Sequence, residues 1–320
     1  PFLIIRSNIF EKSNYIISQD QSIMKINEVY ILEDRGLLYI NGEDSKNFLQ
    51  NIITNDINKV SEDISCFSAL LTPQGKYLYD FIISKHKSGY FLDCEKENIE
   101  DLYKQLNLYK MRSKVEILNL SNEFVIAALS REKFLSLENS KDIAGHTIKF
   151  REDSILLDPR DKELGARLII NLEKLYLSLK KLELKKSNIE SYYMDSHKLG
   201  IAQIGTKYLQ NKIFGIECNF EELNGIDFKK GCFVGQENTA RIKLKEKLKN
   251  RLFAINIISK EIKEDLIIKS NEFEVGKILI KDKYPFAIIK FKDKNFNFEK
   301  NFKCGEATIN IIKPNWIQNL

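Results

Sequence analysis

The stretch that most constrains this 320-residue chain is the glycine-rich run F-K-K-G-C-F-V-G-Q-E-N-T-A-R at residues 228–241. Gly231 and Gly235 allow backbone conformations and close approaches that other residues do not. Cys232 lies between them, and the two lysines before it favour the thiolate form of a nearby thiol. The residues from Gln236 onward predict a helix whose free N–H groups face the glycine turn. The run therefore predicts a tight turn that presents a thiol in front of a helix.

The composition is that of an ordinary globular protein with more than one domain. Hydrophobic residues make up 43% of the chain and charged residues 30%, and 320 residues are enough for two or three domains. The net charge of +5 is too small to indicate nucleic-acid binding. No apolar run is long enough to span a bilayer. We therefore expect neither nucleic acid nor a membrane as a partner.

The cysteines and histidines form no pattern typical of a metal site or a disulfide framework. The five cysteines are widely spaced and lack a C-x-x-C pair, and the three histidines lack an H-E-x-x-H spacing. We therefore expect no metal site and a reducing compartment in which the thiols stay free. The cysteines are Cys66, Cys94, Cys218, Cys232 and Cys304.

Hydrophobic periodicity predicts an α+β body followed by a β-rich end. Residues 66–71 and 77–84 are typical of two strands of a hairpin, because a short turn with a glycine separates them. Apolar residues at helical spacing predict a helix over residues 95–108. After residue 249, short β-rich runs separated by polar turns predict a small antiparallel barrel.

Several motifs resemble one protein family. The run K-G-C-F-V-G-Q-E at 230–237 closely resembles the signature of the YgfZ-type folate-binding proteins of iron–sulfur cluster maintenance. These proteins are related to the glycine-cleavage T-protein, an aminomethyltransferase. Further resemblance lies in N-G-E-D-S-K-N-F-L-Q-N-I-I-T-N-D at 41–56, Y-K-M-R-S-K-V-E-I at 109–117 and I-F-G-I-E-C-N-F at 213–220.

The resemblance implies a fold and a domain division. The fold is a ring-like arrangement of two ferredoxin-like α+β subdomains plus a C-terminal antiparallel β-barrel, with tetrahydrofolate near the centre. Residues 24–248 would form the folate-binding region and residues 249–320 the barrel. The first methionine is Met24, so residues 1–23 are interpreted as an upstream extension, with a genuine short arm as the alternative.

The resemblance also implies folate contacts, led by Glu217. A carboxylate accepts hydrogen bonds from two adjacent N–H groups in one plane, which a pterin presents. The cations Lys230 and Arg241 could meet the glutamate tail of the folate. Phe233 could form an aromatic wall, at a position where the family usually has tyrosine.

Two further residues are candidates for ligand contacts, each with a structural alternative. Asn55, in the T-N-D that ends the 41–56 motif, would lie near the ligand cavity, although helix termination alone also explains it. Arg112 could meet an anion, or it could belong to a loop that leads into an exposed strand.

Two residues are candidates for chemistry. Aminomethyltransferases carry two adjacent acids in the strand that contains Tyr79 and Asp80, so only Asp80 remains as a catalytic candidate; the alternative is a solvent-facing strand residue. Cys232 could act in redox or cluster chemistry, or it could be a small packing residue. One thiol cannot hold a cluster alone, because clusters usually take four protein ligands.

These expectations imply a function with two alternatives. The chain would bind tetrahydrofolate or a one-carbon derivative and act in the assembly or repair of iron–sulfur clusters. Its partners would be iron–sulfur client or assembly proteins, in a bacterial-type cytoplasm or in the mitochondrial matrix. The alternatives are a folate-dependent aminomethyl transferase and a scaffold on the same fold that binds no folate. The incomplete acid pair argues against the transferase.

Overall fold

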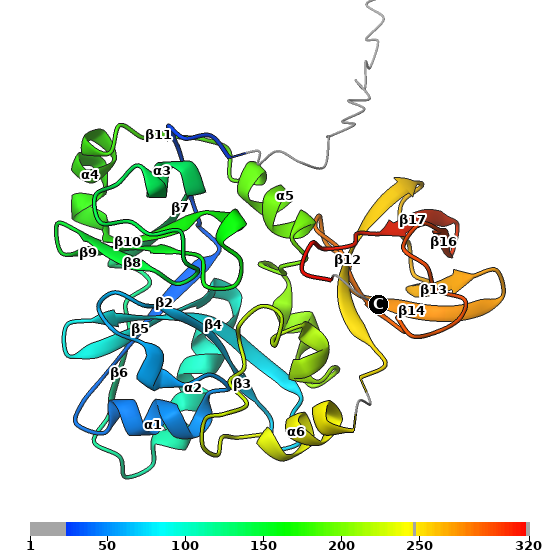
Figure 1. Ribbon diagram of the computed structural model, residues 1–320, viewed down its shortest axis with the longest axis horizontal. Coiled ribbons are helices and arrows are strands. Elements are labelled where there is room, and N and C mark those ends of the chain that lie inside the picture. Colours follow the sequence, from blue (N-terminus) through cyan, green and yellow to red (C-terminus); the bar gives the residue numbers. More distant parts are fainter. Residues whose placement is uncertain (1–23, 246–247, 318–320) are drawn as a thin grey trace, which may run out of the picture.

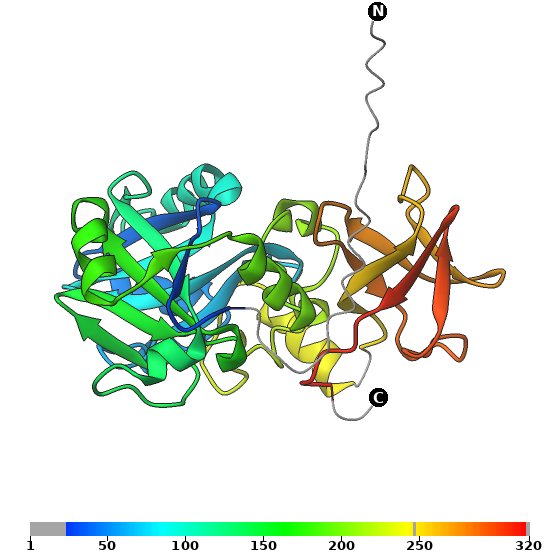
Figure 2. The same ribbon diagram turned by 90° about the horizontal axis from the view of Figure 1, so that it is seen from above.

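The computed structural model describes residues 24–245 and 248–317, and the expected extension at residues 1–23 lies outside the described residues. Two β-sheets form one side of the molecule, a closed β-barrel forms the other, and a segment of short helices lies between them (Figure 1). The view from above shows the barrel set apart from the paired sheets (Figure 2).

The first sheet has five antiparallel strands in the order β3-β4-β5-β2-β6. Helices α1 and α2 pack on its outer face through apolar residues such as Phe48, Leu49, Leu102 and Leu106. The predicted hairpin forms around the turn at residues 73–76. The bounds are β2 Arg35–Asn41, β3 Cys66–Leu71, β4 Tyr77–His86, β5 Gly89–Glu95, β6 Glu116–Asn119, α1 Ser45–Ile52, η1 Ile57–Lys59, η2 Lys96–Asn98 and α2 Ile99–Lys110.

The second sheet has six strands in the order β11-β1-β7-β10-β9-β8, and only the short β1–β11 pair is parallel. Helices α3 and α4 lie against it, with Phe134 fully buried. The bounds are β1 Glu28–Ile31, β7 Phe124–Leu129, α3 Arg131–Leu135, β8 Thr147–Phe150, β9 Asp153–Leu157, η3 Lys162–Leu164, β10 Ala166–Asn171, η4 Leu172–Lys174, α4 Leu175–Lys181 and β11 Lys185–Lys186.

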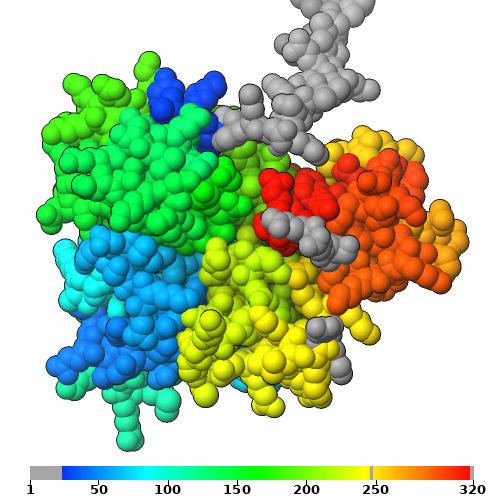
Figure 3. Space-filling model, viewed as in Figure 1, coloured from blue at the N-terminus to red at the C-terminus, as the bar shows by residue number. Residues whose placement is uncertain are grey.

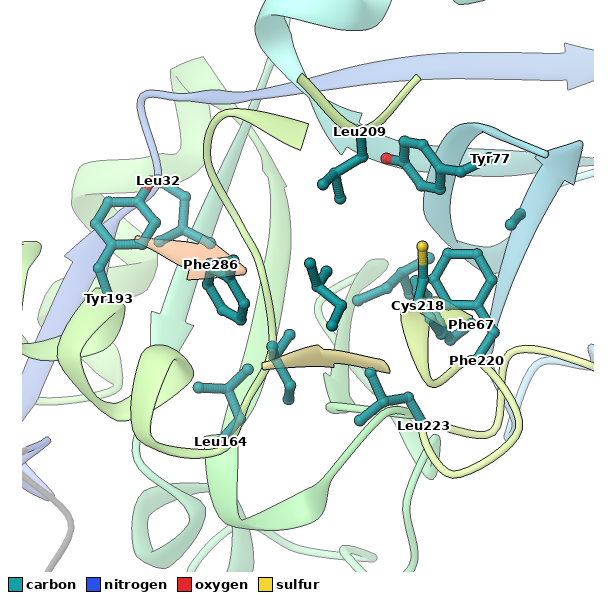
Figure 4. Packing of buried hydrophobic residues seen from close by; sticks show 14 of the residues in the cluster. Leu32, Phe67, Tyr77, Leu164, Tyr193, Leu209, Cys218, Phe220, Leu223 and Phe286 are labelled. Atoms are coloured by element: carbon teal, nitrogen blue, oxygen red, sulfur yellow. The ribbon is translucent and has the colours of Figure 1, made fainter. Parts of the chain in front are cut away.

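The inner faces of the two sheets share one core with the middle segment of the chain. Phe67 and Phe91 come from the first sheet, Leu156 from the second, and Tyr192 and Phe220 from the middle segment. Figure 4 shows part of this cluster, with Cys218 and Phe220 facing Phe67. The middle segment contains α5 Glu190–Lys198, η5 Thr206–Leu209, η6 Gly215–Cys218 and α6 Gln236–Leu244.

The C-terminal part is a closed six-stranded antiparallel barrel with its own core. The sequence predicted the barrel but missed β16, whose residues are flanked by charged and polar side chains that resemble a loop. The strands are β12 Arg251–Ser259, β13 Ile267–Ser270, β14 Phe273–Ile280, β15 Phe286–Ile289, β16 Asn301–Cys304 and β17 Ala307–Ile311. The expected fold class, α+β with a C-terminal antiparallel barrel, is confirmed.

Candidate functional site

The glycine-rich loop before α6 is fixed to the body of the molecule by Lys230. Its ammonium group donates hydrogen bonds to the carbonyl oxygens of Gln50, Ile53 and Asn55, at 2.7, 2.6 and 3.0 Å. These carbonyls lie at the C-terminal end of α1, where helix carbonyls lack partners of their own. Burial lowers the pKa of Lys230 to about 8. Because all three N–H donors are used inside the protein, the geometry gives Lys230 a structural role and not the expected contact to a folate tail.

The thiol of Cys232 is exposed two residues after this anchor. Cys66, Cys94, Cys218 and Cys304 are buried, and burial raises the pKa of each of these thiols. A free cysteine is more often buried than exposed. Cys232 is therefore the one cysteine of this chain that an external group can reach, which disagrees with the packing alternative.

The two glycines of the loop have different surroundings. Gly235 has a φ of 84°, and a Cβ atom there would lie 2.5 Å from the carbonyl oxygen of Thr72. A Cβ atom on Gly231 would meet nothing within 4 Å. Gly235 thus lets the start of α6 pack against the β3–β4 turn, whereas the space beside Gly231 is open.

Asn55 is buried and uses its side chain within the protein. Its amide nitrogen donates to the carbonyl oxygens of Phe67 and Asn224, at 2.7 and 2.8 Å, and its Oδ1 accepts from the backbone N–H of Asp56. The neighbouring Thr54 donates to the carbonyl of Gly225. Both residues tie the end of α1 to the middle segment, so this geometry favours the structural alternative for Asn55.

The remaining three candidates, Phe233, Arg241 and Arg112, do not line one common hollow. Phe233 is buried in the central core and lies 5.2 Å below the ammonium of Lys230. Arg241 is exposed in the last turn of α6, and Arg112 is exposed after α2. None of the three lines the hollow between the first sheet and the middle segment.

A small hollow, partly open to solvent, lies between the first sheet and the middle segment, with about 20 Å³ of space for water-sized groups. Most of its walls are apolar or aromatic, and the charged residues on them are Asp80 and Arg160. A mostly apolar concavity with few polar groups is typical of a small-molecule site. The lining residues are Phe67, Tyr77, Asp80, Arg160, Gly200, Ile201, Ala202, Thr206, Leu209, Cys218, Phe220, Leu223 and Leu252.

Asp80 is held in this hollow by Tyr77. The phenol group of Tyr77 donates to Oδ1 of Asp80 at 2.5 Å. Burial and the neighbouring carboxylate raise the pKa of Tyr77 well above its usual value, so the phenol remains a donor. Among the described residues, Oδ2 of Asp80 has no hydrogen-bond partner. Asp80 therefore lines the hollow and does not lie on an outer strand face.

Glu217 lies beside the hollow, next to Cys218, which lines it. One carboxylate oxygen of Glu217 accepts from the backbone N–H of Phe214 at 2.9 Å, and the other accepts from the amide of Asn250 at 3.0 Å. Glu217 thus caps η6 and connects it to the segment before the barrel. Each oxygen has one protein donor already, so a ligand would have to share the carboxylate or displace Asn250.

A buried network of charges next to the hollow was missed at the sequence level. Arg35 and Arg167 both pair with Asp93, and Arg160 makes two hydrogen bonds to Asp158, at 2.9 and 2.6 Å. All five side chains are at least 90% buried. The only sequence signals are the D-P-R turn and the G-A-R entry to β10, and neither shows that these charges meet. Arg160 brings the network to the hollow, where its guanidinium lies 5.5 Å from the ring of Phe67.

The described residues show neither a metal-ligand cluster nor a membrane-spanning helix. In residues 24–245 and 248–317, no three His, Cys, Asp or Glu side chains are close enough to hold a metal ion. None of the described helices is long and apolar enough to cross a bilayer.

Comparison with solved structures decides the fold. The glycine cleavage system aminomethyltransferase T from Bartonella henselae matches with a TM-score of 0.69, covering 92% of this chain and 88% of that protein, at 10% sequence identity. The chain has the aminomethyltransferase fold. At this identity the match to the aminomethyltransferase concerns the fold alone. No protein-family model matches the chain.

Comparison with curated proteins finds relatives with one recurring name. The mitochondrial iron-sulfur cluster assembly factor IBA57 homolog of Dictyostelium discoideum is 26% identical over 270 residues, which are 76% of this chain and 66% of that protein. The homolog of Neurospora crassa is 29% identical over 235 residues, which are 69% of this chain and 52% of that protein. The chain therefore spans about half to two thirds of the length of these relatives.

Proposed function

We propose that this chain is an iron–sulfur cluster assembly or repair factor of the YgfZ and IBA57 type. The observation that carries the proposal is the position of Cys232, an exposed thiol on a loop that Lys230 anchors to α1. A thiol held on a fixed backbone can be presented to a partner in one orientation. The names of the relatives agree with this role.

The thiol would act together with a partner protein. Cys232 can supply one ligand, whereas a cluster usually takes four. No other cysteine of this chain is exposed. We therefore propose that any cluster contact is shared with an iron–sulfur client or assembly protein, in a reducing compartment such as a bacterial cytoplasm or the mitochondrial matrix.

We propose that tetrahydrofolate binds at the central hollow, which would have to open to admit a pterin. Phe67 and Phe220 line the hollow and offer aromatic surface to a flat ring. Oδ2 of Asp80 could accept a hydrogen bond from the ring, and Glu217 is the second carboxylate in reach of the rim. A bound tetrahydrofolate would supply one-carbon chemistry; the protein residues would orient the ring and exclude water.

Calorimetry tests the folate proposal. Tetrahydrofolate should bind the wild-type chain, and Asp80→Asn and Glu217→Gln should each weaken binding about tenfold, because each exchanges an ionised acceptor for a neutral one. Glu116→Gln, at an exposed acid that does not line the hollow, is the matched control. Absence of binding to the wild type would leave the chain as a scaffold without folate.

The transferase alternative has one observation in its favour, the position of Asp80 in the hollow beside Tyr77. Against it, the neighbour in the strand is Tyr79, a buried residue with no acid group. An assay with tetrahydrofolate and a protein that carries an S-aminomethyl-dihydrolipoyl group separates the two roles, because transfer yields methylenetetrahydrofolate, ammonia and the free dihydrolipoyl protein. Turnover that is lost in Asp80→Asn would favour the transferase.

The assembly role is tested in cells. The chain should restore the activity of a [4Fe–4S] enzyme in a bacterial strain that lacks its own factor of this type. An empty vector is the control. Unchanged, low activity with well-expressed, folded protein would contradict the proposed function.

A further inference from the structure

Arg160 lines the hollow and keeps one nitrogen of its guanidinium free. Its Nε and Nη2 donate to the carboxylate of Asp158, at 2.9 and 2.6 Å, and the residue is only 3% exposed. The Nη1 atom points away from this paired edge and has no hydrogen-bond partner in residues 24–245 and 248–317. The guanidinium carbon lies 5.5 Å from the ring centroid of Phe67, which lines the same hollow. Because a buried donor without an acceptor costs free energy, a ligand oxygen beside Nη1 is favoured.

The charge around Arg160 also favours an oxygen from a ligand. Three arginines share two aspartates through ion pairs, and all five residues are at least 90% buried. Asp158 is divided between two of the arginines, because Nε of Arg167 lies 3.5 Å from the same oxygen that pairs with Arg160. The charge of Arg160 is therefore only partly balanced within this network. The five residues are Arg35, Asp93, Asp158, Arg160 and Arg167.

The other charged residue on the walls of the hollow, Asp80, offers the opposite kind of contact. Its Oδ1 accepts from the phenol of Tyr77 at 2.5 Å, and its Oδ2 has no hydrogen-bond partner among the described residues. The walls thus carry one free carboxylate oxygen as an acceptor and one free guanidinium nitrogen as a donor. Most of the remaining wall is apolar, and the rings of Phe67 and Phe220 belong to it (Figure 4). To satisfy both free groups, a flat ligand must donate one hydrogen bond and accept another.

The lactam edge of a heterocycle meets both requirements. In a lactam, an N–H donor and a carbonyl acceptor stand on adjacent ring atoms, so one can serve Asp80 and the other Arg160. A ring with an amino group in place of the carbonyl has no acceptor there, and a neighbouring carboxylate favours its protonated, cationic form. Arg160 would repel that cation, and Asp80 would repel a ligand carboxylate. The two residues together therefore select a neutral lactam.

We propose that Arg160 sets the specificity of the hollow for a lactam heterocycle. Its Nη1 donates to the ring carbonyl oxygen, and Oδ2 of Asp80 accepts from the adjacent ring N–H. Asp158 is a positioning residue that fixes the plane of the guanidinium. A pterin carries this edge at its 4-oxo group and N3–H, so the inference rests on the proposed binding of tetrahydrofolate at the hollow. The ring enters beside the middle segment, coloured yellow-green to yellow, which packs against the sheets on the face shown in Figure 3.

A matched pair of ligands tests this inference on the wild-type chain. Tetrahydrofolate and tetrahydroaminopterin differ only in the 4-substituent, which is a carbonyl in the first and an amino group in the second. In calorimetry tetrahydrofolate should bind about tenfold tighter or more, because the 4-amino compound leaves Nη1 of Arg160 without an acceptor. Equal binding of the two compounds, or tighter binding of the 4-amino compound, would overturn the inference. Binding of neither compound would overturn the folate proposal together with the inference that rests on it.

The variant Arg160→Lys shows whether Arg160 causes the preference. Lysine keeps a positive charge beside Asp158 but cannot offer a planar fork to the aspartate and the ligand at once. We expect tetrahydrofolate to bind about fivefold more weakly or worse, and the 4-amino compound to stay within about twofold of its wild-type affinity. Arg151→Lys, at an exposed arginine that does not line the hollow, is the matched control and should keep the wild-type preference.

Circular dichroism and a melting curve show whether Arg160→Lys is folded. A folded Arg160→Lys protein that keeps the wild-type preference for tetrahydrofolate would overturn the inference and leave the folate proposal intact. If this variant does not fold, the comparison of the two ligands on the wild-type chain decides alone.

Discussion

At the residue scale, the surroundings of His86 show how burial lowers the pKa of a histidine. The imidazole stacks on Phe91 with ring centroids 4.0 Å apart, and it meets Phe124 edge-on at 5.9 Å. Burial among these rings disfavours the charged form and lowers the pKa of His86 to about 4. His86 is therefore neutral in the folded protein at neutral pH and acts as an aromatic packing residue.

This lowered pKa predicts a loss of stability in acid. Between pH 6.5 and 4 the unfolded chain binds a proton at His86 that the folded chain does not, so the free energy of unfolding falls as the pH drops through this window. The melting temperature of the wild type should decrease over this range. His86→Phe, which keeps the ring packing, should show a smaller decrease. Parallel melting curves for the two proteins would contradict the assignment.

Residue roles were the least predictable part of the sequence. The K-G-C motif identified Cys232 as a thiol worth testing, and the structure shows it exposed. Lys230, one of its neighbours in the motif, is used to cap α1, and Glu217 caps η6. The sequence gives the type of each side chain. Which helix end a side chain caps depends on which helix ends lie near it in space, and only the fold brings them together.

At the scale of elements, the two glycines before α6 give a matched pair of substitutions. Gly235→Ala places a Cβ atom 2.5 Å from a carbonyl oxygen at a positive φ, so we expect a loss of about 2–4 kcal/mol in stability. Gly231→Ala meets open space and should change stability by less than about 0.5 kcal/mol. Chemical denaturation measures both. Equal losses would contradict this account of the loop.

The clamp between Lys230 and α1 is a second property of this element. Lys230→Met removes the donor to three carbonyl oxygens, and we expect a loss of about 2 kcal/mol or more. Lys229→Met, at the exposed neighbour, is the control and should stay within about 0.5 kcal/mol of the wild type. The denaturation midpoints of the two variants and of the wild type measure this difference in stability. A Lys230→Met protein as stable as the wild type would show that the clamp contributes nothing.

Elements with strong periodicity or clear turn signals were predictable. The hairpin of β3 and β4 follows from apolar runs around a glycine turn, and α2 from its regular apolar spacing. β16 was missed because its short run is flanked by polar residues. Its strand conformation depends on pairing with β13 and β17, which lie elsewhere in the sequence.

At the scale of the whole molecule, the barrel is joined to the body by contacts from both of its ends. Arg251 at the start of β12 pairs with Glu222, at 2.5 Å. Trp316, after the last strand, donates its indole N–H to the carbonyl of Leu199 at the end of α5, at 3.0 Å, and packs against both cores. The barrel is thus tied to the segment that forms the hollow.

The single tryptophan makes this coupling measurable. Because Trp316 lies between the barrel and α5, its fluorescence should change in the same denaturant transition as the far-UV circular dichroism. The two midpoints should agree. A fluorescence transition at clearly lower denaturant would show that the barrel separates before the body unfolds.

The fold as a whole was predictable from motif resemblance, whereas the buried charge network was not. Arg35, Asp93 and Arg167 are far apart in sequence: the pairing of β2 with β5 brings Arg35 to Asp93, and Arg167 on β10 joins them when the two sheets pack. Each residue alone is typical of an exposed surface. Asp80 illustrates the intermediate case, because an acid within an apolar strand was visible in the sequence, but its partner Tyr77 and its place in the hollow were not.

The role of the Cys232 thiol can be measured directly in cells. Wild type, Cys232→Ala and the buried-thiol control Cys304→Ala are expressed in cells that lack their own factor, and the activity of a [4Fe–4S] enzyme is measured. We expect that Cys232→Ala folds and binds tetrahydrofolate like the wild type but loses at least tenfold in enzyme activity, while Cys304→Ala retains most of it. Full activity of Cys232→Ala at wild-type expression would contradict the account.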